Sequence, residues 1–151
     1  DYVNQLHQSR AVATYAEDVD KLTDAAKEYI APLPLDYLPN AEVDAFFGAM
    51  AMPGMKQGDA GNLSKAQAMK DATMAWSIAQ RVGSGKLVHL NGNFHSTAHS
   101  GIIAYLDRYR PGLTVGTVEV VRQEDIGRLD EAKRGKADFF ICVPRDMTST
   151  F

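Results

Sequence analysis

The stretch from Lys86 to Gly101, KLVHLNGNFHSTAHSG, constrains the fold more than any other part of the chain. It begins with a short apolar run, residues 87–90, whose length and content are typical of a buried strand. The run ends at Asn91-Gly92-Asn93, residue types that tolerate the left-handed backbone of a tight turn. A helix is expected to start near Ser96 or Thr97, so His95 should lie between a strand's carboxyl end and a helix. Ligands of α/β proteins bind in that crevice.

Two further segments predict strands in the last third of the chain. Residues 113–121 are rich in valine and threonine, and residues 137–143 form a continuous apolar run of the kind found in strands covered on both faces. The polar residues 122–134 between them predict a surface crossover. The order strand, helix (97–110), strand, crossover, strand implies parallel pairing. The expected fold class is therefore α/β, with helices layered around a mainly parallel sheet.

The first 82 residues carry no strand signal and predict a mainly helical half. Apolar residues at helical spacing indicate helices within residues 1–30, 41–50 and 63–82. Thr23 is the expected cap of the later helix in the first of these segments, and Pro32 ends that helix. Residues 83–151 are expected to form a β-α-β-β core that completes a single unit.

Three strands are fewer than the five or six of a usual α/β sheet. We therefore expect either that the chain is the later part of a larger α/β domain or that the sheet gains strands from another chain. The helical first half favours the first alternative.

Composition excludes some classes of function. The chain has 151 residues, 45% hydrophobic content and a net charge of −3, so it lacks the basic balance expected of a nucleic-acid binder. No window approaches the ~18 consecutive apolar residues of a transmembrane helix. The single cysteine, Cys142, lies inside an apolar run and is expected to be a buried structural thiol.

Two polar residues interrupt an apolar stripe of the helix predicted for residues 63–82. Gln67 and Asp71 share one helical face with Met74 and Ile78. A polar pair in this position is expected to be at least partly buried and to need hydrogen-bond partners. Two interpretations stay open: the pair satisfies the backbone of a neighbouring loop, or it orients a ligand or a site histidine.

Among the histidines, His95 is the strongest candidate for a functional role. An imidazole nitrogen at this turn could bind haem iron or a divalent metal, while the alternative is a histidine that only holds the turn. His99 would share a face with His95 if the helix began by Ser96, which makes it a weak second metal ligand. His89 is expected to pack within the sheet.

Three segments of the chain resemble the ChaN-like family of bacterial iron-regulated lipoproteins, the haem-binding uptake family. These segments are residues 65–75, 89–95 and 101–106, and residues 137–147 are similar to the family as well. The sequence Gly92-Asn93-Phe94-His95 also matches the Gly-x-x-His signature of a wider group, which includes Tiki metalloproteases and erythromycin-esterase-like enzymes.

The resemblance implies that residues 1–151 are the C-terminal portion of a haem-binding domain whose earlier half contributes to the same site. It implies a lipoprotein of the bacterial cell envelope, on the periplasmic or outer-membrane face, that binds haem for iron uptake. The implied partners are haem and either the N-terminal half of the same domain or a second protomer, as in a homodimer. The resemblance gives little support for an enzymatic activity.

The turn, the polar pair and the resemblance together predict a set of ligand-binding residues, with His95 as the candidate haem iron ligand. The set comprises His95, Asn93, Gly92, Gln67, Asp71 and Tyr2. Gly92 is expected to allow close approach of the backbone, and Asn93 to hold the turn or contact the ligand. The alternative function is a metal-dependent hydrolase that uses the Gly-x-x-His motif. In that case His95 would be a divalent-metal or acid–base group, supported by Gln67 and Asp71.

Overall fold

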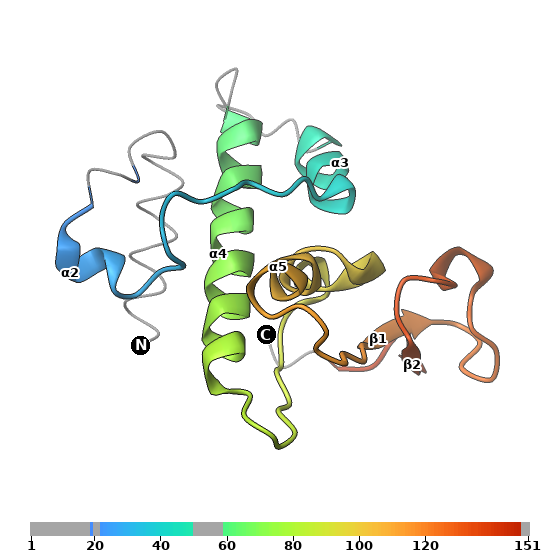
Figure 1. Cartoon of the computed structure of the whole chain (residues 1–151). Helices are drawn as coiled ribbons and strands as arrows, with labels where there is room; N and C mark the ends of the chain where they lie inside the picture. Colours follow the sequence, from blue (N-terminus) through green and yellow to red (C-terminus); the bar gives the residue numbers. More distant parts are fainter. Residues whose placement is uncertain (1–18, 20–21, 50–58, 149–151) are drawn as a thin grey trace.

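The computed structural model describes residue 19 and residues 22–49 and 59–148. A long helix, α4 (Asp59–Arg81), forms the centre of the fold, and both α3 (Ala41–Ala49) and α5 (Ile102–Tyr109) pack against it (Figure 1). The other described elements are α2 (Asp24–Lys27), β1 (Val118–Gln123), β2 (Phe139–Pro144) and the 3-10 turns η2 (Asn93–His95), η3 (Thr97–His99) and η4 (Glu131–Lys133).

α3 and α4 match the sequence prediction, whereas α2 ends at Lys27, before the predicted stop at Pro32. α3 and α4 cover the segments predicted as 41–50 and 63–82, and α4 begins four residues earlier. Thr23 caps α2, because its hydroxyl oxygen accepts a hydrogen bond from the Ala26 N–H at 3.3 Å. The helix predicted near the start of the chain lies outside the described residues.

Small side chains on α4 allow α5 to pack closely against it. Ala72 and Ala75 are fully buried, and they face the buried α5 residues Ile102 and Leu106. Because alanine leaves room for a neighbouring helix, larger side chains from α5 fill the space between the two axes. Each fully buried leucine or isoleucine contributes about 2 kcal/mol. This contact fixes α5, and the turn before it, relative to α4.

Tyr105 on α5 joins this core to the connector of residues 31–40. Its hydroxyl donates to the Asp36 carbonyl at 2.8 Å and accepts from the Leu38 N–H at 2.9 Å. The side chain is 2% exposed, and this burial raises the pKa of Tyr105 to about 12. The connector is therefore held against the helices by a neutral phenol.

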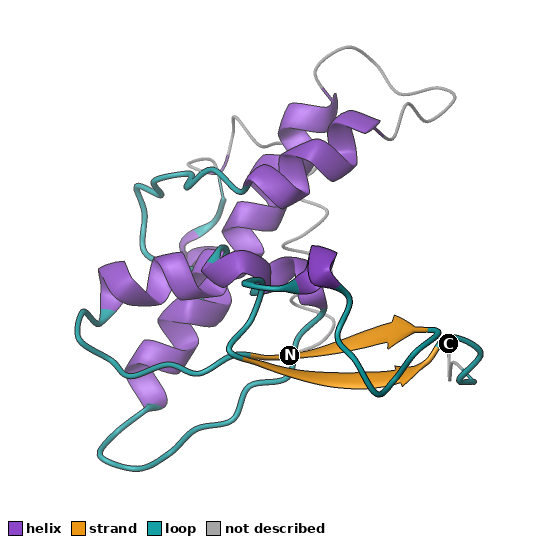
Figure 2. Ribbon diagram, turned by 90° about the vertical axis from the view of Figure 1, so that its right-hand side faces the viewer, coloured by secondary structure: helices purple, strands orange, loops and turns teal. Residues whose placement is uncertain are grey.

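The two strands form a parallel sheet, which confirms the predicted α/β class. Val118 pairs with Phe139 and Val120 with Ile141, and Figure 2 shows both strands on one side of the helices. β1 starts five residues later than the first residue of the predicted strand. The prediction that residues 137–143 are covered on both faces is wrong, because Phe139 is 66% exposed. Val118, Val120 and Ile141 on the same face of the sheet are also exposed. Cys142, which was predicted to be buried, is only half-buried.

The segment 87–90 is not a strand, contrary to the prediction. It runs as an irregular segment without ladder hydrogen bonds to any described residue, and Val88 and Leu90 are 85% and 89% exposed. A strand exists only where a neighbour supplies main-chain partners. The described part of the chain offers none at this position, so the apolar run alone does not produce a strand.

The helix predicted for residues 97–110 also begins later than expected. Ala98 and His99 adopt left-handed backbone conformations, with φ of 54° and 55°, so the chain reverses before α5 starts at Ile102. The Ala98 N–H donates to the Lys136 carbonyl at 2.7 Å, which ties this reversal to the segment before β2. Such conformations cost free energy for residues with a Cβ, and tertiary contacts hold them.

None of the described helices is both long enough and apolar enough to span a membrane.

Candidate functional site

The candidate site is built where α4 faces the turn that contains His95. Gln67 and Asp71 lie one helical turn apart on α4, as the sequence predicted, and both face the His95 ring. Asp71 is 1% exposed and Gln67 is half-buried. Both polar side chains find their partner in a histidine rather than in a loop backbone. Of the two interpretations of this pair, the geometry matches the one in which it orients a histidine.

The contacts define the tautomer of His95. The Nδ1 atom lies 2.5 Å from Asp71 Oδ1, so the Nδ1–H donates to the carboxylate. The Gln67 amide nitrogen lies 2.9 Å from Nδ1 and 3.0 Å from Nε2. Because the Nδ1 proton is directed to Asp71, this amide can donate only to Nε2. A carboxylate on one ring nitrogen fixes the ring and makes the other nitrogen more basic.

Burial changes the electrostatics of the pair. Desolvation raises the pKa of Asp71 above its ordinary value, while the hydrogen bond and the charge of His95 act in the opposite direction. Partial desolvation, together with the charge of His95, lowers the pKa of His89. His89 is exposed on the unpaired segment, so the expectation that it packs within the sheet is wrong.

Gly101 is a residue of this site that sequence analysis missed. Its φ is +54°, and a Cβ there would lie 2.5 Å from the His95 carbonyl oxygen and 2.8 Å from Asp71 Oδ2. Only glycine allows the chain to pass between these two groups. The one available signal was a glycine within the helix predicted for residues 97–110, where glycine is unfavourable.

Gly92 and Asn93 begin the Gly-x-x-His motif, and Asn93 holds the turn. The Asn93 amide donates to Glu119 Oε1 at 3.3 Å and to the Val120 carbonyl at 3.4 Å, which anchors η2 to β1. Gly92 has an extended backbone with φ of −70°, and an added Cβ would meet only His95 Cδ2 at 3.9 Å. The expected left-handed turn at residues 91–93 is wrong, since the reversal falls at Ala98 and His99.

His99 belongs to a different cluster. Its Nε2 atom lies 3.2 Å from Asp138 Oδ2 and 3.4 Å from Thr117 Oγ1. Asp138 also accepts from the Thr117 N–H at 2.7 Å and the Thr117 hydroxyl at 2.8 Å, and these bonds lower the pKa of Asp138 to about 2. The left-handed backbone turns His99 towards the starts of both strands, so it does not join His95.

Within the described residues, no group of three or more histidine, cysteine, aspartate or glutamate side chains could hold a metal ion. The remaining predicted site residue, Tyr2, lies outside the described residues.

The described α/β chain thus holds one imidazole, oriented by a buried carboxylate, at the turn that precedes α5. Residues 5–106 match the family described as "Haem-binding uptake, Tiki superfamily, ChaN", which is more than half of the chain, and the protein belongs to this family. The family supports haem binding in general. The comparisons found no matching curated protein and no matching solved structure.

Proposed function

We propose that this protein binds haem at the bacterial cell envelope, as part of iron and haem uptake, and that His95 is the iron ligand. The family supports haem binding and uptake. The observation that carries the assignment to His95 is its short contact with the buried carboxylate of Asp71. Histidines that bind metals commonly donate their second ring N–H to a carboxylate in this way. A role in haem uptake favours a protein located in the cell envelope, and we propose that it is a lipoprotein there.

The donor set fits a haem iron ligand. Haem, when bound, would supply an iron that a histidine nitrogen can hold. Asp71 holds Nδ1, so Nε2 is the nitrogen available to iron once the Gln67 amide rotates away. The His95 side chain is 20% exposed, so a ligand can reach it from the surface.

Aromatic residues beside His95 offer a surface for the porphyrin. Phe94 is 42% exposed and Phe46 is 40% exposed, and their ring centroids lie 4.7 Å apart. The pocket behind Asp71 has a volume of about 170 Å³, which is below the range of pockets for drug-sized ligands. We therefore place the porphyrin against Phe94 and Phe46 rather than in this pocket.

A second surface is needed to cover the other side of a porphyrin held in this way. We propose that it comes from the N-terminal half of the same domain or from a second protomer in a homodimer. The exposed apolar face of the sheet supports this proposal, since a two-stranded parallel sheet usually continues and is covered by helices.

The test is a hemin titration followed by the Soret band. The wild-type protein should bind hemin and shift the band, and His95→Ala should weaken binding at least tenfold, which is ~1.4 kcal/mol. His99→Ala is the matched control, because it removes an imidazole from the adjacent turn while leaving the Asp71–His95 pair in place. An unchanged Soret band in the wild type, or equal affinities of the wild type and His95→Ala, would exclude the assignment.

The metal-dependent hydrolase has less support than haem binding. The described residues offer His95 and Asp71 together, but no third histidine, cysteine, aspartate or glutamate beside them. Elemental analysis of the purified protein for divalent metals, made alongside the hemin titration, distinguishes the two functions. A bound divalent metal would favour the hydrolase, and hemin binding without such a metal would favour the haem-binding protein.

A further inference from the structure

The turn that carries His95 receives a buried carboxylate from two different elements. Asp71 of α4 accepts the hydrogen bond from His95 Nδ1 and thereby fixes the imidazole ring. Glu119 of β1 is 7% exposed and contacts the residues on either side of His95 instead of the ring itself. The contribution of Glu119 to the site therefore concerns the backbone of the turn.

Glu119 occupies a strand position that ordinarily takes an apolar side chain. Burial alternates along β1, so that Glu119 and Val121 are buried, whereas Val118 and Val120 are exposed on the opposite face. Removing a carboxylate from water costs free energy unless hydrogen bonds compensate for it. A glutamate on the buried face of a strand therefore indicates that its hydrogen bonds serve a purpose at this position.

The two oxygens of Glu119 join residues that are placed symmetrically about His95. Oε1 accepts from the Asn93 side-chain amide at 3.3 Å, and Oε2 accepts from the Thr97 hydroxyl at 3.4 Å. Asn93 precedes His95 by two residues, and Thr97 follows it by two. Among the described residues, the Glu119 side chain has no other hydrogen bond and no ion pair. The carboxylate thus bridges both ends of segment 93–97.

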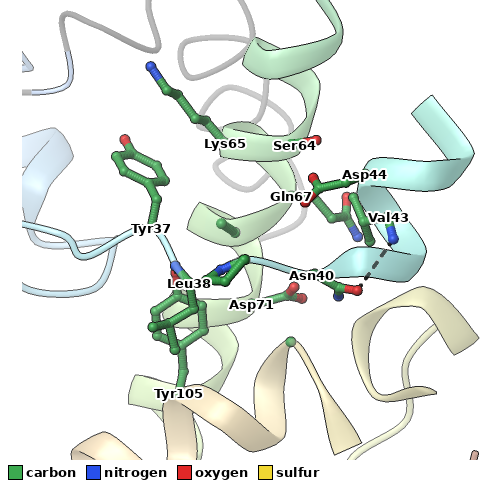
Figure 3. Close-up of a pocket in the computed structure, with 13 residues that line it drawn as sticks. Tyr37, Leu38, Asn40, Val43, Asp44, Ser64, Lys65, Gln67, Asp71 and Tyr105 are labelled. Atoms are coloured by element: carbon green, nitrogen blue, oxygen red, sulfur yellow. Dashed lines mark hydrogen bonds between the residues drawn. The ribbon is translucent and has the colours of Figure 1, made fainter. Parts of the chain in front are cut away.

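Other contacts hold the opposite side of this segment. Figure 3 shows the Gln67 and Asp71 side chains on the side of α4 that faces Asn40. The Asn40 amide nitrogen donates to the Phe94 carbonyl at 3.4 Å, and its oxygen accepts from the Val43 N–H at 3.3 Å, which the figure marks with a dashed line. The helices and the connector therefore hold one side of the turn, and Glu119 joins the other side to the sheet.

We propose that Glu119 is a positioning residue for His95. By bridging Asn93 and Thr97, it keeps the imidazole where Nδ1 meets Asp71 and where Nε2 can be presented to a ligand. The statement that this ligand is haem iron rests on the proposed function. Residues that orient a metal-binding histidine affect the affinity for the metal without touching it.

The test compares two substitutions of Glu119. Glu119→Leu keeps an apolar side chain of similar size in the buried position but removes both hydrogen bonds. Glu119→Gln can keep both, because its amide oxygen accepts from Asn93 and its amide N–H can donate to the Thr97 hydroxyl oxygen. The two variants therefore differ in the bridge and share the filling of the strand position.

Two measurements follow the position of His95. In NMR spectra of the hemin-free protein, the Nδ1 proton signal of His95 should shift or broaden in Glu119→Leu and stay in place in Glu119→Gln. In hemin titrations, Glu119→Leu should weaken binding about fivefold, which corresponds to the loss of about one hydrogen bond, and Glu119→Gln should bind like the wild type.

Val121→Ala is the matched control. It removes buried volume from the same face of β1 and lowers stability, but Val121 makes no hydrogen bond to segment 93–97 with its side chain. Both His95 readouts should stay unchanged in this variant. Circular dichroism ensures that each variant is compared in its folded state.

A wild-type Nδ1 signal in folded Glu119→Leu would overturn the proposal, as would equal changes in Glu119→Leu and Val121→Ala. If Glu119→Leu does not fold, Thr97→Val takes its place, because it removes one bond and keeps the side-chain shape. A changed Nδ1 signal in Thr97→Val then supports the proposal, and an unchanged signal contradicts it. A wild type that binds no hemin would exclude the proposed function, while the hemin-free spectra would still decide the role of Glu119.

Discussion

Gly101 is the residue on which the Asp71–His95 pair depends most directly. Replacing it with alanine adds a Cβ 2.5 Å from a backbone carbonyl oxygen and imposes a positive φ on a residue that disfavours it. We expect Gly101→Ala to lower the free energy of unfolding by about 3 kcal/mol. Urea unfolding gives this value, and the downfield Nδ1 proton signal of His95 should disappear from the NMR spectrum.

Gly112 provides the matched control for this substitution. Its φ is +81°, but nothing lies within 4 Å of an added Cβ, so Gly112→Ala introduces only the conformational cost of about 1 kcal/mol. The difference between the two variants isolates the steric contribution of the site. Equal destabilisation of the two variants would contradict the interpretation that glycine is needed at position 101 to make room for the His95 carbonyl and the Asp71 carboxylate.

Asp138 makes the stability of the protein depend on pH in the acid range. Its pKa in the folded protein is about 2, below the ordinary value of 3.8, because Thr117 and His99 donate hydrogen bonds to it. Between these values the folded state binds fewer protons than the unfolded state, so this contribution is present above pH 3.8 and is lost as the pH falls towards 2. We expect the wild type to melt at a higher temperature than Asp138→Asn at neutral pH, and the difference to vanish near pH 2.

Thermal melts of both variants across this pH range test the assignment. Asp107→Asn serves as the control, because this exposed carboxylate on α5 has no hydrogen bond or ion pair among the described residues. A difference between wild type and Asp138→Asn that stays constant down to pH 2 would show that Asp138 does not carry the pH dependence.

At the scale of elements, the end of α4 depends on one side chain of the segment after α5. The Arg110 guanidinium donates to the carbonyl oxygens of Ala79 at 3.0 Å, of Val82, and of Gly83 at 3.4 Å. The last carbonyl groups of a helix lack partners within it, so these bonds close α4 and join it to α5. We expect Arg110→Ala to lower the free energy of unfolding by about 2 kcal/mol, measured by urea denaturation.

Arg108→Ala is the control for this prediction. Arg108 pairs with Asp36 at 2.6 Å, but the two side chains are 49% and 83% exposed. An exposed ion pair contributes less than about 1 kcal/mol, so this variant should be nearly as stable as the wild type. If the two arginine variants lose equal stability, the carbonyl cluster does not hold the helix end.

Helical periodicity predicted the elements that pack through their own side chains. Apolar residues at helical spacing identified α3 and α4, and Thr23 identified the start of α2. The start of α5 could not be predicted in this way. The left-handed residues Ala98 and His99 depend on contacts with Lys136 and Asp138, far along the chain, and no local pattern encodes these contacts.

The same contrast applies to the site. The polar interruption of the α4 stripe predicted that Gln67 and Asp71 would be at least partly buried and hydrogen-bonded, and the turn position singled out His95. The exact pairing of the three residues required the packing of α5 on α4, because that packing brings Gly101 between Asp71 and the His95 backbone. The role of Asn93 as an anchor to β1 likewise depends on a long-range contact.

At the scale of the whole molecule, the sheet is where sequence and structure differ most. The apolar runs at 87–90 and 137–143 have the composition of buried strands, yet the first is unpaired and the second is covered on one face only, within the described residues. An apolar composition indicates that a segment is suited to burial. A strand forms only where a neighbouring segment also supplies main-chain hydrogen bonds. No described element pairs with residues 87–90.

The unpaired segment at residues 87–90 also has a consequence for handling the protein. Its exposed Val88 and Leu90 lie next to main-chain groups that take no ladder hydrogen bonds from the described residues. Apolar β-prone segments in this state act as templates for self-association into aggregates. We therefore expect this short segment to promote association of the chain at high concentration, and a charged substitution at Leu90 to improve its solubility.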